Sequence, residues 1–249
     1  MRVHLKALGC RLNEAELEIW AEDFRRQGHT ITDNSREADL IVLNTCAVTN
    51  EAVKKSRQLI RQAHRSNSMS KLVITGCSAS LEPELEQKIS GIDLLVPNHE
   101  KDRLVDIVSR RLALEATPGI GTDPDEIPLF LRGRNRAFIK IQDGCRYRCS
   151  YCVVTVARGA ERSRTEEAII GQINRLHARS VKEVVLTGVH VGGYGSDIDS
   201  DLYTLLKKIL AETSIPRIRL ASVEPWDLHE NFFELFDNNR LMPHLHLPG

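Results

Sequence analysis

The sequence has none of the segments that mark a membrane or secreted protein. No apolar run approaches the ~18 residues that a membrane-spanning helix needs. The N-terminus lacks the apolar core of roughly 7–15 residues found in secretory signals, and it continues directly into a polar, helix-like stretch. Internal repeats and long low-complexity tracts are also absent. We therefore expect a cytoplasmic protein with no membrane partner.

The chain also carries no net charge, because 34 Lys and Arg residues balance 34 Asp and Glu residues. This balance argues against a nucleic-acid surface that covers the whole chain. The charge is unevenly spread, however: between Arg132 and Arg164 nine basic residues stand against Asp143 and Glu161. Such a block suits contact with phosphates, but it is equally typical of a solvated loop face.

Cysteine is too sparse for a disulfide scaffold, with six residues in 249. Three disulfides are possible by number, but thiols in the cytosol stay reduced. Metal or redox chemistry is the better interpretation. The six are Cys10, Cys46, Cys77, Cys145, Cys149 and Cys152.

Strand-like and helix-like segments alternate along the chain, which predicts an α/β protein with parallel sheets. For residues 1–114 we expect strands at 2–8, 38–45, 72–75 and 92–96, and helices at 13–27, 50–64, 83–89 and 101–114. Residues 115–134 have the Pro, Gly and acidic composition of a linker. Residues 135–249 form a second series, with strands at 137–142, 183–187, 217–222 and 244–247 and helices at 165–178, 202–211 and 228–236. This series is the opening half of a partial (β/α) barrel, so the chain ends before its own architecture closes.

The most specific motif is Cys145-Arg-Tyr-Arg-Cys149-Ser-Tyr-Cys152, which follows a predicted strand. Three thiolates on one loop can bind three irons of a [4Fe–4S] cube and leave the fourth iron open. An open iron can chelate S-adenosylmethionine, and one electron then releases a 5′-deoxyadenosyl radical. Tyr151, the aromatic residue before the last cysteine, is typical of this motif and would pack beside the cofactor. A zinc site and a set of inert buried thiols are the alternatives, but no fourth ligand stands at zinc-site spacing.

The other three cysteines each follow a predicted strand of the first series. Cys10, Cys46 and Cys77 would therefore meet at one edge of a parallel sheet, where the carboxyl ends of the strands lie together. They suit a second [4Fe–4S] cluster, again with an open iron. The alternative is three separate buried thiols, since cysteine is common in protein cores.

These motifs resemble the radical S-adenosylmethionine superfamily, through the cysteine loop and the strand end Leu186-Thr187-Gly188-Val189-His190. The phrases LGCRLNEAE, NTCAVTNEA, ITGCSA and CRYRCSYCVVTVARGAERSR narrow the resemblance to the methylthiotransferases. TGVHVGGYG, RLASVEPWDL and LMPHLHLP look most like the threonylcarbamoyladenosine tRNA branch. The resemblance covers nearly the whole chain, and it implies a flavodoxin-like N-terminal domain followed by an incomplete radical SAM barrel.

The resemblance implies a tRNA-modifying enzyme that methylthiolates C2 of N6-threonylcarbamoyladenosine next to the anticodon. Cys145, Cys149 and Cys152 would hold the cluster that generates the radical, and Cys10, Cys46 and Cys77 the cluster that carries the sulfur. A reductant such as flavodoxin or ferredoxin would supply electrons, while the oligomeric state is left open. Methylthiolation of a protein side chain, and a non-catalytic iron–sulfur protein, are the alternatives. Relative to the family, the chain stops before the last barrel strands and an RNA-binding β-domain.

Roles are also expected for residues outside the cysteine motifs. Gly188, Val189 and His190 would line the cofactor, and Ser222 and Glu224 would follow the third barrel strand, with Glu224 either binding ribose or capping a helix. Contacts with tRNA phosphates are expected from Arg158, Arg162 and Arg164, unless they lie on a solvated face. His244 and His246 would bind metal or form hydrogen bonds within the barrel. Asn13 and Asn44 would bind cluster sulfurs or form turns.

Overall fold

The computed structural model describes residues 1–114 and 136–248. The expected linker at 115–134 lies outside the described residues. Packing separates the described chain into two units. The first contains residues 1–114 together with Tyr151–Arg158, and the second contains residues 136–150 and 159–248. The proposed domain bounds stay predictions, since these units follow spatial packing rather than chain order.

The first unit is built on one parallel sheet with the strand order β2-β1-β3-β4-β5. Its strands are β1 (Arg2–Ala7), β2 (Thr30–Ile31), β3 (Leu40–Thr45), β4 (Lys71–Gly76) and β5 (Leu94–Val96). This order is the flavodoxin-like one, in which helices cover both faces of the sheet. All six residues of β3 are buried, as expected for a central strand covered on both sides. The predicted flavodoxin-like α/β fold is confirmed.

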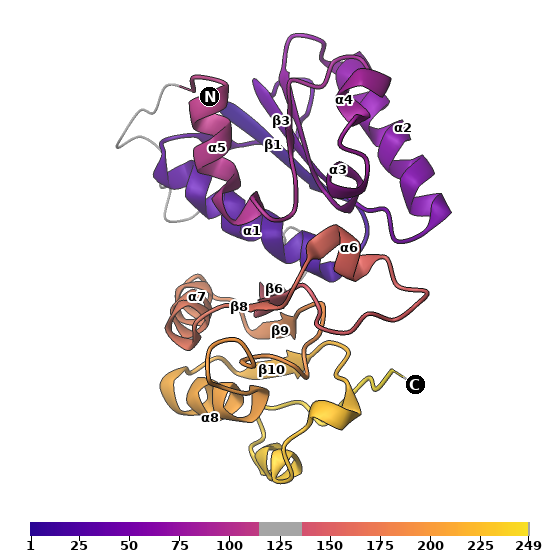
Figure 1. Ribbon diagram of the computed structural model, residues 1–249. Helices are drawn as coiled ribbons and strands as arrows, with labels where there is room; N and C mark the ends of the chain where they lie inside the picture. Colours follow the sequence, from indigo (N-terminus) through magenta and orange to yellow (C-terminus); the bar gives the residue numbers. More distant parts are fainter. Residues whose placement is uncertain (115–135, 249) are drawn as a thin grey trace. The chain divides into compact units, whose positions relative to one another are not determined.

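Helices pack on both faces of this sheet (Figure 1). One face carries α1 (Arg11–Arg26) and α5 (Leu104–Arg111), the latter preceded by the 3₁₀ turn η1 (Lys101–Arg103). The other carries α2 (Asn50–Ser66), α3 (Cys77–Leu81) and α4 (Leu85–Lys88). On that second face Ile41, Ile60 and Ile74 belong to one buried apolar cluster. The short helix α6 (Val154–Arg158) also belongs to this unit and packs against α3.

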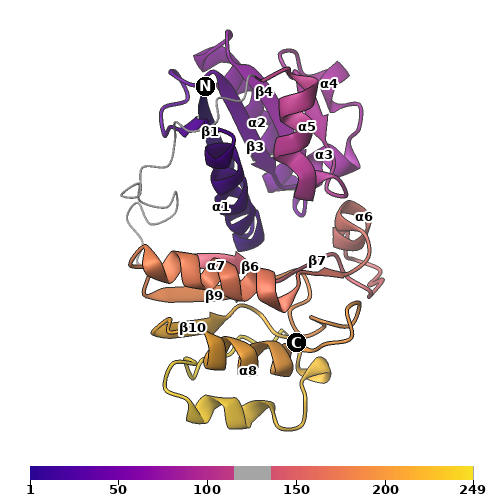
Figure 2. The ribbon, with the colours of Figure 1, turned by 90° about the vertical axis from the view of Figure 1, so that its left-hand side faces the viewer.

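The second unit repeats the pattern of strand, helix and parallel strand. Strands β6 (Arg136–Lys140), β9 (Glu183–Thr187) and β10 (Arg217–Leu220) form a parallel sheet in the order β10-β9-β6. Helices α7 (Glu166–Ala178) and α8 (Leu202–Glu212) provide the crossovers and lie beside the strands (Figure 2). Two-residue strands β7 (Gln142–Asp143) and β8 (Arg162–Ser163) pair antiparallel. This arrangement is the expected opening half of a (β/α) barrel.

Two predicted elements of the second unit are wrong in type. The strand expected at 244–247 is reduced to isolated parallel bridges, Ile218 with Leu241 and Ser222 with His246. Pro243 and Pro248 flank this segment, and proline cannot donate to a strand ladder. The helix expected at 228–236 is replaced by the 3₁₀ segments η2 (Pro225–Asp227) and η3 (Phe232–Asp237). In η3 only the residues at 232 and 235 are buried, a spacing of three that matches a 3₁₀ turn.

Candidate functional site

Cys10, Cys46 and Cys77 lie just beyond the carboxyl ends of β1, β3 and β4, at one edge of the first unit's sheet. Cys10 is exposed at the start of α1, whereas Cys46 and Cys77 are buried, and all three are free thiols. Gly9 has a φ of +107°, and a Cβ added there would lie 2.8 Å from the Cys46 sulfur. A glycine is therefore required for the chain bearing Cys10 to approach Cys46 so closely.

Burial and neighbouring charges shift the pKa of Cys46. Burial raises the pKa of Cys46 above its ordinary value. The charges of Cys77 and Cys10 raise that pKa further, whereas the Arg158 guanidinium opposes the rise. A metal that held the three sulfurs as thiolates would relieve this mutual repulsion, so the donor set fits an iron–sulfur cluster.

Hydrogen bonds fix the backbone around this cysteine trio. The Ser56 and Ser78 hydroxyls donate to the Cys46 carbonyl at 2.8 and 3.0 Å. The Asn98 amide nitrogen donates toward the Cys77 sulfur at 3.8 Å. The Cys10 thiol donates toward Asn13 Oδ1 at 3.6 Å, which bears out the expected place of Asn13 beside a cysteine sulfur. Such second contacts orient metal ligands and tune a bound metal.

Asn44 points elsewhere than expected. Its amide nitrogen donates to Glu16 Oε2 at 2.8 Å and to the Asn13 carbonyl at 3.2 Å. Asn44 therefore connects β3 to α1 behind the cysteines rather than binding a sulfur.

The second cysteine motif begins in the second unit, on the turn after β7. Gly144 has a φ of +71°, and a Cβ there would lie 1.9 Å from the Ala160 carbonyl oxygen, so only glycine fits. The Cys145 amide donates to the Gly159 carbonyl at 3.1 Å. Cys145 and Cys152 are half-buried, Cys149 is exposed, and all three lie outside any disulfide. Three accessible thiols on one loop suit a cluster that shares an open iron with a small cofactor.

The packing units divide this motif between its second and third cysteines. Cys145 and Cys149 belong to the second unit, whereas Cys152 belongs to the segment that packs in the first. The chain passes from the second unit to the first between Ser150 and Tyr151, so two cysteines of the motif precede this point and one follows it.

A buried polar cluster surrounds Cys145 in the second unit. A ring nitrogen of His190 and a carboxylate oxygen of Glu161 lie within 4.8 Å of the Cys145 sulfur and of each other. His190 is 1% exposed, and its Nδ1 forms a hydrogen bond with Glu161 Oε1. Its Nε2 lies 2.7 Å from Asp227 Oδ2. Two carboxylates thus occupy the ring nitrogens of His190, and the expected lining of the cofactor by residues 188–190 stays a prediction.

Asp227 extends this cluster to the cysteine loop, and sequence reasoning did not single it out. Arg146 Nη2 donates to Asp227 Oδ1 at 2.5 Å, and the Tyr147 hydroxyl lies 3.4 Å from the same oxygen. The Tyr147 ring also packs edge-on against His190, with centroids 5.0 Å apart. Both residues that follow Cys145 are thus held by Asp227, which itself stands in the VEPWD phrase.

The other residues expected to line the cofactor lie at the ends of β9 and β10. Gln142 Oε1 accepts from the amides of Val189 and His190 at 3.0 and 2.9 Å, which fixes the strand end that begins at Gly188. Glu224 Oε2 accepts from the Gly192 amide at 3.0 Å and makes no cap hydrogen bond to η2, so the helix-capping alternative is wrong.

The remaining predicted positions are exposed or bound within the protein. Tyr151 is 90% exposed. The Ser222 hydroxyl lies 2.7 Å from His246 Nδ1, which places His246 in a hydrogen bond within the barrel segment, and His244 is exposed. Neither His244 nor His246 lies in a group of metal-binding side chains among the described residues.

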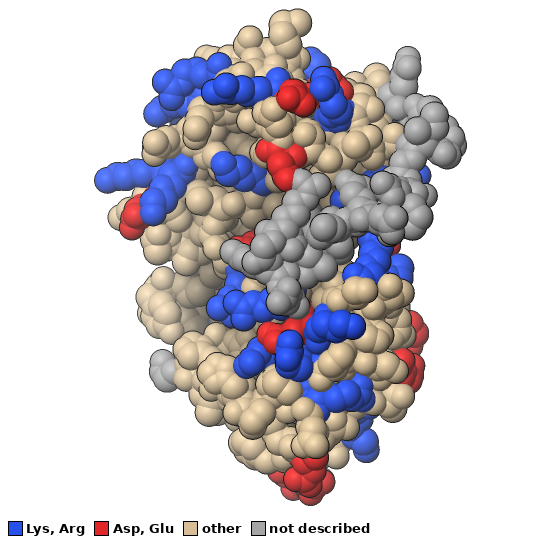
Figure 3. All heavy atoms as spheres, turned by 180° about the vertical axis from the view of Figure 1, so that it is seen from behind, with Lys and Arg blue, Asp and Glu red and all other residues tan. Residues whose placement is uncertain are grey.

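The expected arginine contacts with RNA are not all possible. Arg158 is 3% exposed and forms an ion pair with Glu16, so a contact with tRNA phosphates is excluded for this residue. Arg162 and Arg164 are half-buried; Arg164 donates to the Lys140 carbonyl at 2.7 Å. On the face shown in Figure 3, Lys and Arg side chains are prominent, and Asp and Glu side chains lie among them.

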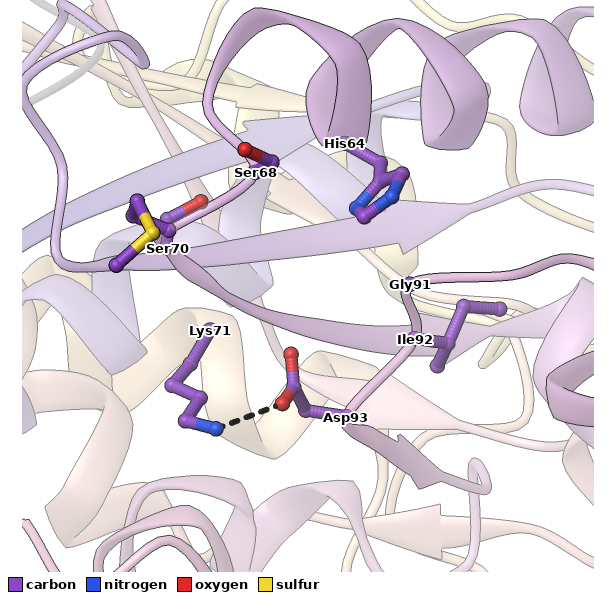
Figure 4. A pocket seen from close by; sticks show the side chains of 8 residues that line it. His64, Ser68, Ser70, Lys71, Gly91, Ile92 and Asp93 are labelled. Atoms are coloured by element: carbon purple, nitrogen blue, oxygen red, sulfur yellow. Dashed lines mark hydrogen bonds and ion pairs between the residues drawn. The ribbon is translucent and has the colours of Figure 1, made fainter.

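A separate cavity of about 260 Å³ lies in the first unit beside the amino ends of β4 and β5 (Figure 4). The ion pair of Lys71 and Asp93, 2.9 Å apart, lies at its wall, together with His64 and Gly91. This cavity is at the opposite edge of the sheet from the cysteines, so it is not part of the candidate site.

The described helices include none long and apolar enough to span a bilayer.

Each half of the chain matches a known protein family. Residues 2–97 match the family described as uncharacterized protein family UPF0004, and residues 139–248 match the radical SAM superfamily. The chain is 34% identical to the threonylcarbamoyladenosine tRNA methylthiotransferase MtaB of Bacillus subtilis, over 99% of this chain and 57% of that protein. The MtaB of Thermotoga maritima is also 34% identical, with 98% and 57% covered. A putative methylthiotransferase of Helicobacter pylori is 33% identical, with 99% and 58% covered.

The fold likewise resembles a solved radical SAM structure. The radical S-adenosylmethionine methyltransferase TsrM of Kitasatospora setae, solved with cobalamin and a [4Fe–4S] cluster, superposes with a TM-score of 0.61 at 17% identity. The match covers 96% of this chain and 59% of that one. The chain spans little more than half the length of the curated relatives it matches. Its two matched regions, its relatives and its fold agree: the chain belongs to the radical SAM methylthiotransferase family, which implies a [4Fe–4S] cluster and S-adenosylmethionine.

Proposed function

We propose that the chain carries the two cluster-binding parts of a tRNA methylthiotransferase that modifies C2 of N6-threonylcarbamoyladenosine next to the anticodon. The observation that carries this proposal is the N-terminal cysteine trio, Cys10, Cys46 and Cys77, whose thiols follow three neighbouring strands of one sheet. A single cluster would need only Cys145, Cys149 and Cys152. Relatives named threonylcarbamoyladenosine tRNA methylthiotransferases support the choice of substrate.

In this proposal Cys145, Cys149 and Cys152 bind one [4Fe–4S] cluster, and the sulfurs of Cys10, Cys46 and Cys77 bind another. When held by Cys145, Cys149 and Cys152, a cluster would supply the electron for reductive cleavage of S-adenosylmethionine, and a cluster held by Cys10, Cys46 and Cys77 would supply a site for sulfur. A flavodoxin- or ferredoxin-like reductant supplies the electron, and tRNA is the partner. Arg162 and Arg164 remain the proposed RNA-contacting side chains.

The chain's own residues position these groups. Gln142 holds the end of β9 by accepting from two successive amides. Its amide nitrogen also donates to the Gly144 carbonyl at 2.7 Å, so the same side chain holds the turn before Cys145. Asp227 binds Arg146 and thereby restrains the loop between Cys145 and Cys149. Pre-organised ligands of this kind lower the entropy lost when a metal binds.

Anaerobic reconstitution with iron and sulfide tests the chemistry. Two clusters predict about eight irons per chain and the formation of 5′-deoxyadenosine from S-adenosylmethionine. Cys149→Ala should abolish that cleavage and leave about four irons in the N-terminal site. Four irons in the unchanged chain without cofactor cleavage would instead support a non-catalytic iron–sulfur protein.

The substrate is tested separately, by nucleoside analysis of tRNA from cells that lack the gene. Loss of the 2-methylthio group from threonylcarbamoyladenosine is the expected result. Unchanged tRNA would contradict the proposed substrate and would direct the search to methylthiolated protein side chains.

A further inference from the structure

The segment Tyr151–Arg158 follows two cysteines of the second unit but packs within the first. Its helix α6 contacts α3, the helix that begins at Cys77. Ala157 is 3% exposed, and its carbonyl accepts from the Asn98 amide nitrogen at 2.7 Å. The same nitrogen faces the Cys77 sulfur at 3.8 Å. One end of α6 is therefore bonded to a side chain that contacts an N-terminal cysteine.

Arg158, the last residue of α6, makes a second and stronger connection. Its Nη2 donates to Asn13 Oδ1 at 2.5 Å, and its Nη1 lies 3.3 Å from Glu16 Oε1. All three side chains are at most 3% exposed. Charge-assisted contacts with a planar guanidinium fix geometry more tightly than contacts with a lysine ammonium, because the guanidinium donors are held in one plane.

Asn13 connects Arg158 to the backbone beside the cysteines. Its Nδ2 donates to the Leu8 carbonyl at 2.8 Å and to the Thr45 carbonyl at 3.2 Å. Those two carbonyls lie two residues before Cys10 and one residue before Cys46. Its Oδ1 receives both Arg158 and, at 3.6 Å, the Cys10 thiol. Arg158 therefore sets the position of an amide that touches the chain beside two of the three N-terminal cysteines.

We infer that Arg158 is a positioning residue for the N-terminal cluster, acting through Asn13. The inference rests on the proposed second cluster, and it replaces the RNA-binding role expected for this arginine. Its consequence is that the chain which supplies Cys152 to one cluster also completes the surroundings of the other. Assembly of the N-terminal cluster then depends on the correct folding of the segment that follows the radical motif.

The test uses the full chain with Cys145, Cys149 and Cys152 replaced by alanine, so that only the N-terminal cluster forms. In this background Arg158→Gln should release iron to a chelator about tenfold faster, as is usual when an outer contact of a metal ligand is lost. The electron paramagnetic resonance spectrum of the reduced cluster should also change. Asn13→Ala should change the rate and the spectrum in the same direction.

Lys101→Gln is the matched control. Lys101 is fully buried and pairs with the same Glu16 oxygen at 2.5 Å, so its loss also breaks a buried ion pair. This variant should lose thermal stability yet keep the spectrum of the background protein. If Arg158→Gln fails to fold, Arg158→Lys replaces it, because a lysine retains the charge but not the paired donors, and the same tenfold effect is expected.

The outcomes separate the inference from the function on which it rests. If the background protein binds no iron, both the second cluster and the inference are rejected. If it binds about four irons and Arg158→Gln matches it in release rate and spectrum, the inference alone is rejected. An equal spectral change in Lys101→Gln would also reject it, since the effect would then be general loss of structure.

Discussion

Asp227 connects a buried histidine to the loop of the radical motif. One carboxylate oxygen faces His190 and the other accepts from Arg146, while the side chain of Asp227 is 12% exposed. The Arg146 side chain is 40% exposed, so the shielding of this pair comes from the Asp227 side, where the carboxylate also faces the buried His190. A single carboxylate therefore restrains two residues of the loop between the first two cysteines.

Asp227→Asn should weaken the cluster bound by Cys145, Cys149 and Cys152, because the neutral amide binds Arg146 and His190 less strongly. In a chain with Cys10, Cys46 and Cys77 replaced by alanine, we expect iron release to a chelator to be about tenfold faster. Glu234→Gln is the control, since it neutralises an exposed carboxylate of the nearby η3. Equal release rates in the two variants would show that Asp227 does not restrain the loop.

Two histidines of the first unit predict an acid-sensitive fold. Burial lowers the pKa of His29 and of His4 below the ordinary value of 6.5, although a hydrogen bond with the Thr32 carbonyl opposes this for His4. Neither ring nitrogen of His29 has a hydrogen-bond partner among the described residues. Both rings therefore stay neutral in the folded chain at a pH where the unfolded chain already binds protons.

The free energy of unfolding should consequently fall as the pH drops below about 6.5 and be independent of these histidines above it. His29→Phe removes one of the two groups, so it should reduce the slope between about pH 5 and 6.5 in urea unfolding. His99→Gln, at an exposed position, should leave the slope unchanged. A slope as steep in His29→Phe as in the unchanged chain would refute the assignment.

At the scale of elements, the turn from β4 into α3 places Cys77. Gly76 has φ and ψ of 93° and −164°, a region that essentially only glycine occupies. A Cβ there would lie 2.2 Å from the Thr45 carbonyl oxygen and 2.6 Å from Asn44 Oδ1. Both neighbours belong to β3, whose end carries Cys46. The close approach of these two strand ends thus depends on a missing side chain.

Gly76→Ala should lower the free energy of unfolding by about 3 kcal/mol, since it combines backbone strain with a clash against the Thr45 backbone. Gly171→Ala in α7 should instead raise the free energy of unfolding. Its Cβ would meet only the end of the Arg175 side chain at 3.4 Å, and alanine favours a helix by about 1 kcal/mol. Urea unfolding of both variants tests the pair; a neutral effect at Gly76 would contradict the tight turn.

The elements that the sequence predicted well are those whose type follows from the pattern of their own residues. The β3 and β9 strands were expected because short apolar runs suit strands covered on both faces, and every residue of both is buried. Helix α6 was missed because its residues Val154, Thr155 and Val156 are β-branched, which disfavours a helix. Its packing against α3 supplies what local propensity does not.

The site residues show the same difference between local patterns, which the sequence reveals, and contacts between distant residues, which it does not. The six cysteines were recognisable from their spacing and from their places after strands. Arg158 was assigned to RNA because it stands in a basic stretch, whereas its partner Glu16 lies 142 residues away in the chain. No local pattern reveals such a pairing. Asp227 and Glu161 were missed for the same reason, since their partners are brought together only by the fold.

At the scale of the whole molecule, each unit has its own apolar core. Ile74 in β4 is fully buried in one cluster, and Leu206 in α8 is fully buried in another. Truncating either residue to alanine leaves a cavity that typically costs 2–5 kcal/mol, or about 3 kcal/mol for a well-packed strand residue. Because the clusters share no residue, the two substitutions should destabilise different parts of the chain.

Hydrogen exchange measured by mass spectrometry can therefore assign the segment Tyr151–Arg158 to its folding unit. In Ile74→Ala, exchange should accelerate in α1, in β3 and in this segment together, because Ala157 and Arg158 are bonded to Asn98 and Asn13 of the first unit. The β9 strand and α8 should keep their protection. In Leu206→Ala the pattern should reverse, with β9 and α8 exposed and the segment protected. If the segment instead followed Leu206→Ala, it would fold with the radical motif that precedes it, and its contacts with the N-terminal cysteines would contribute little to its stability.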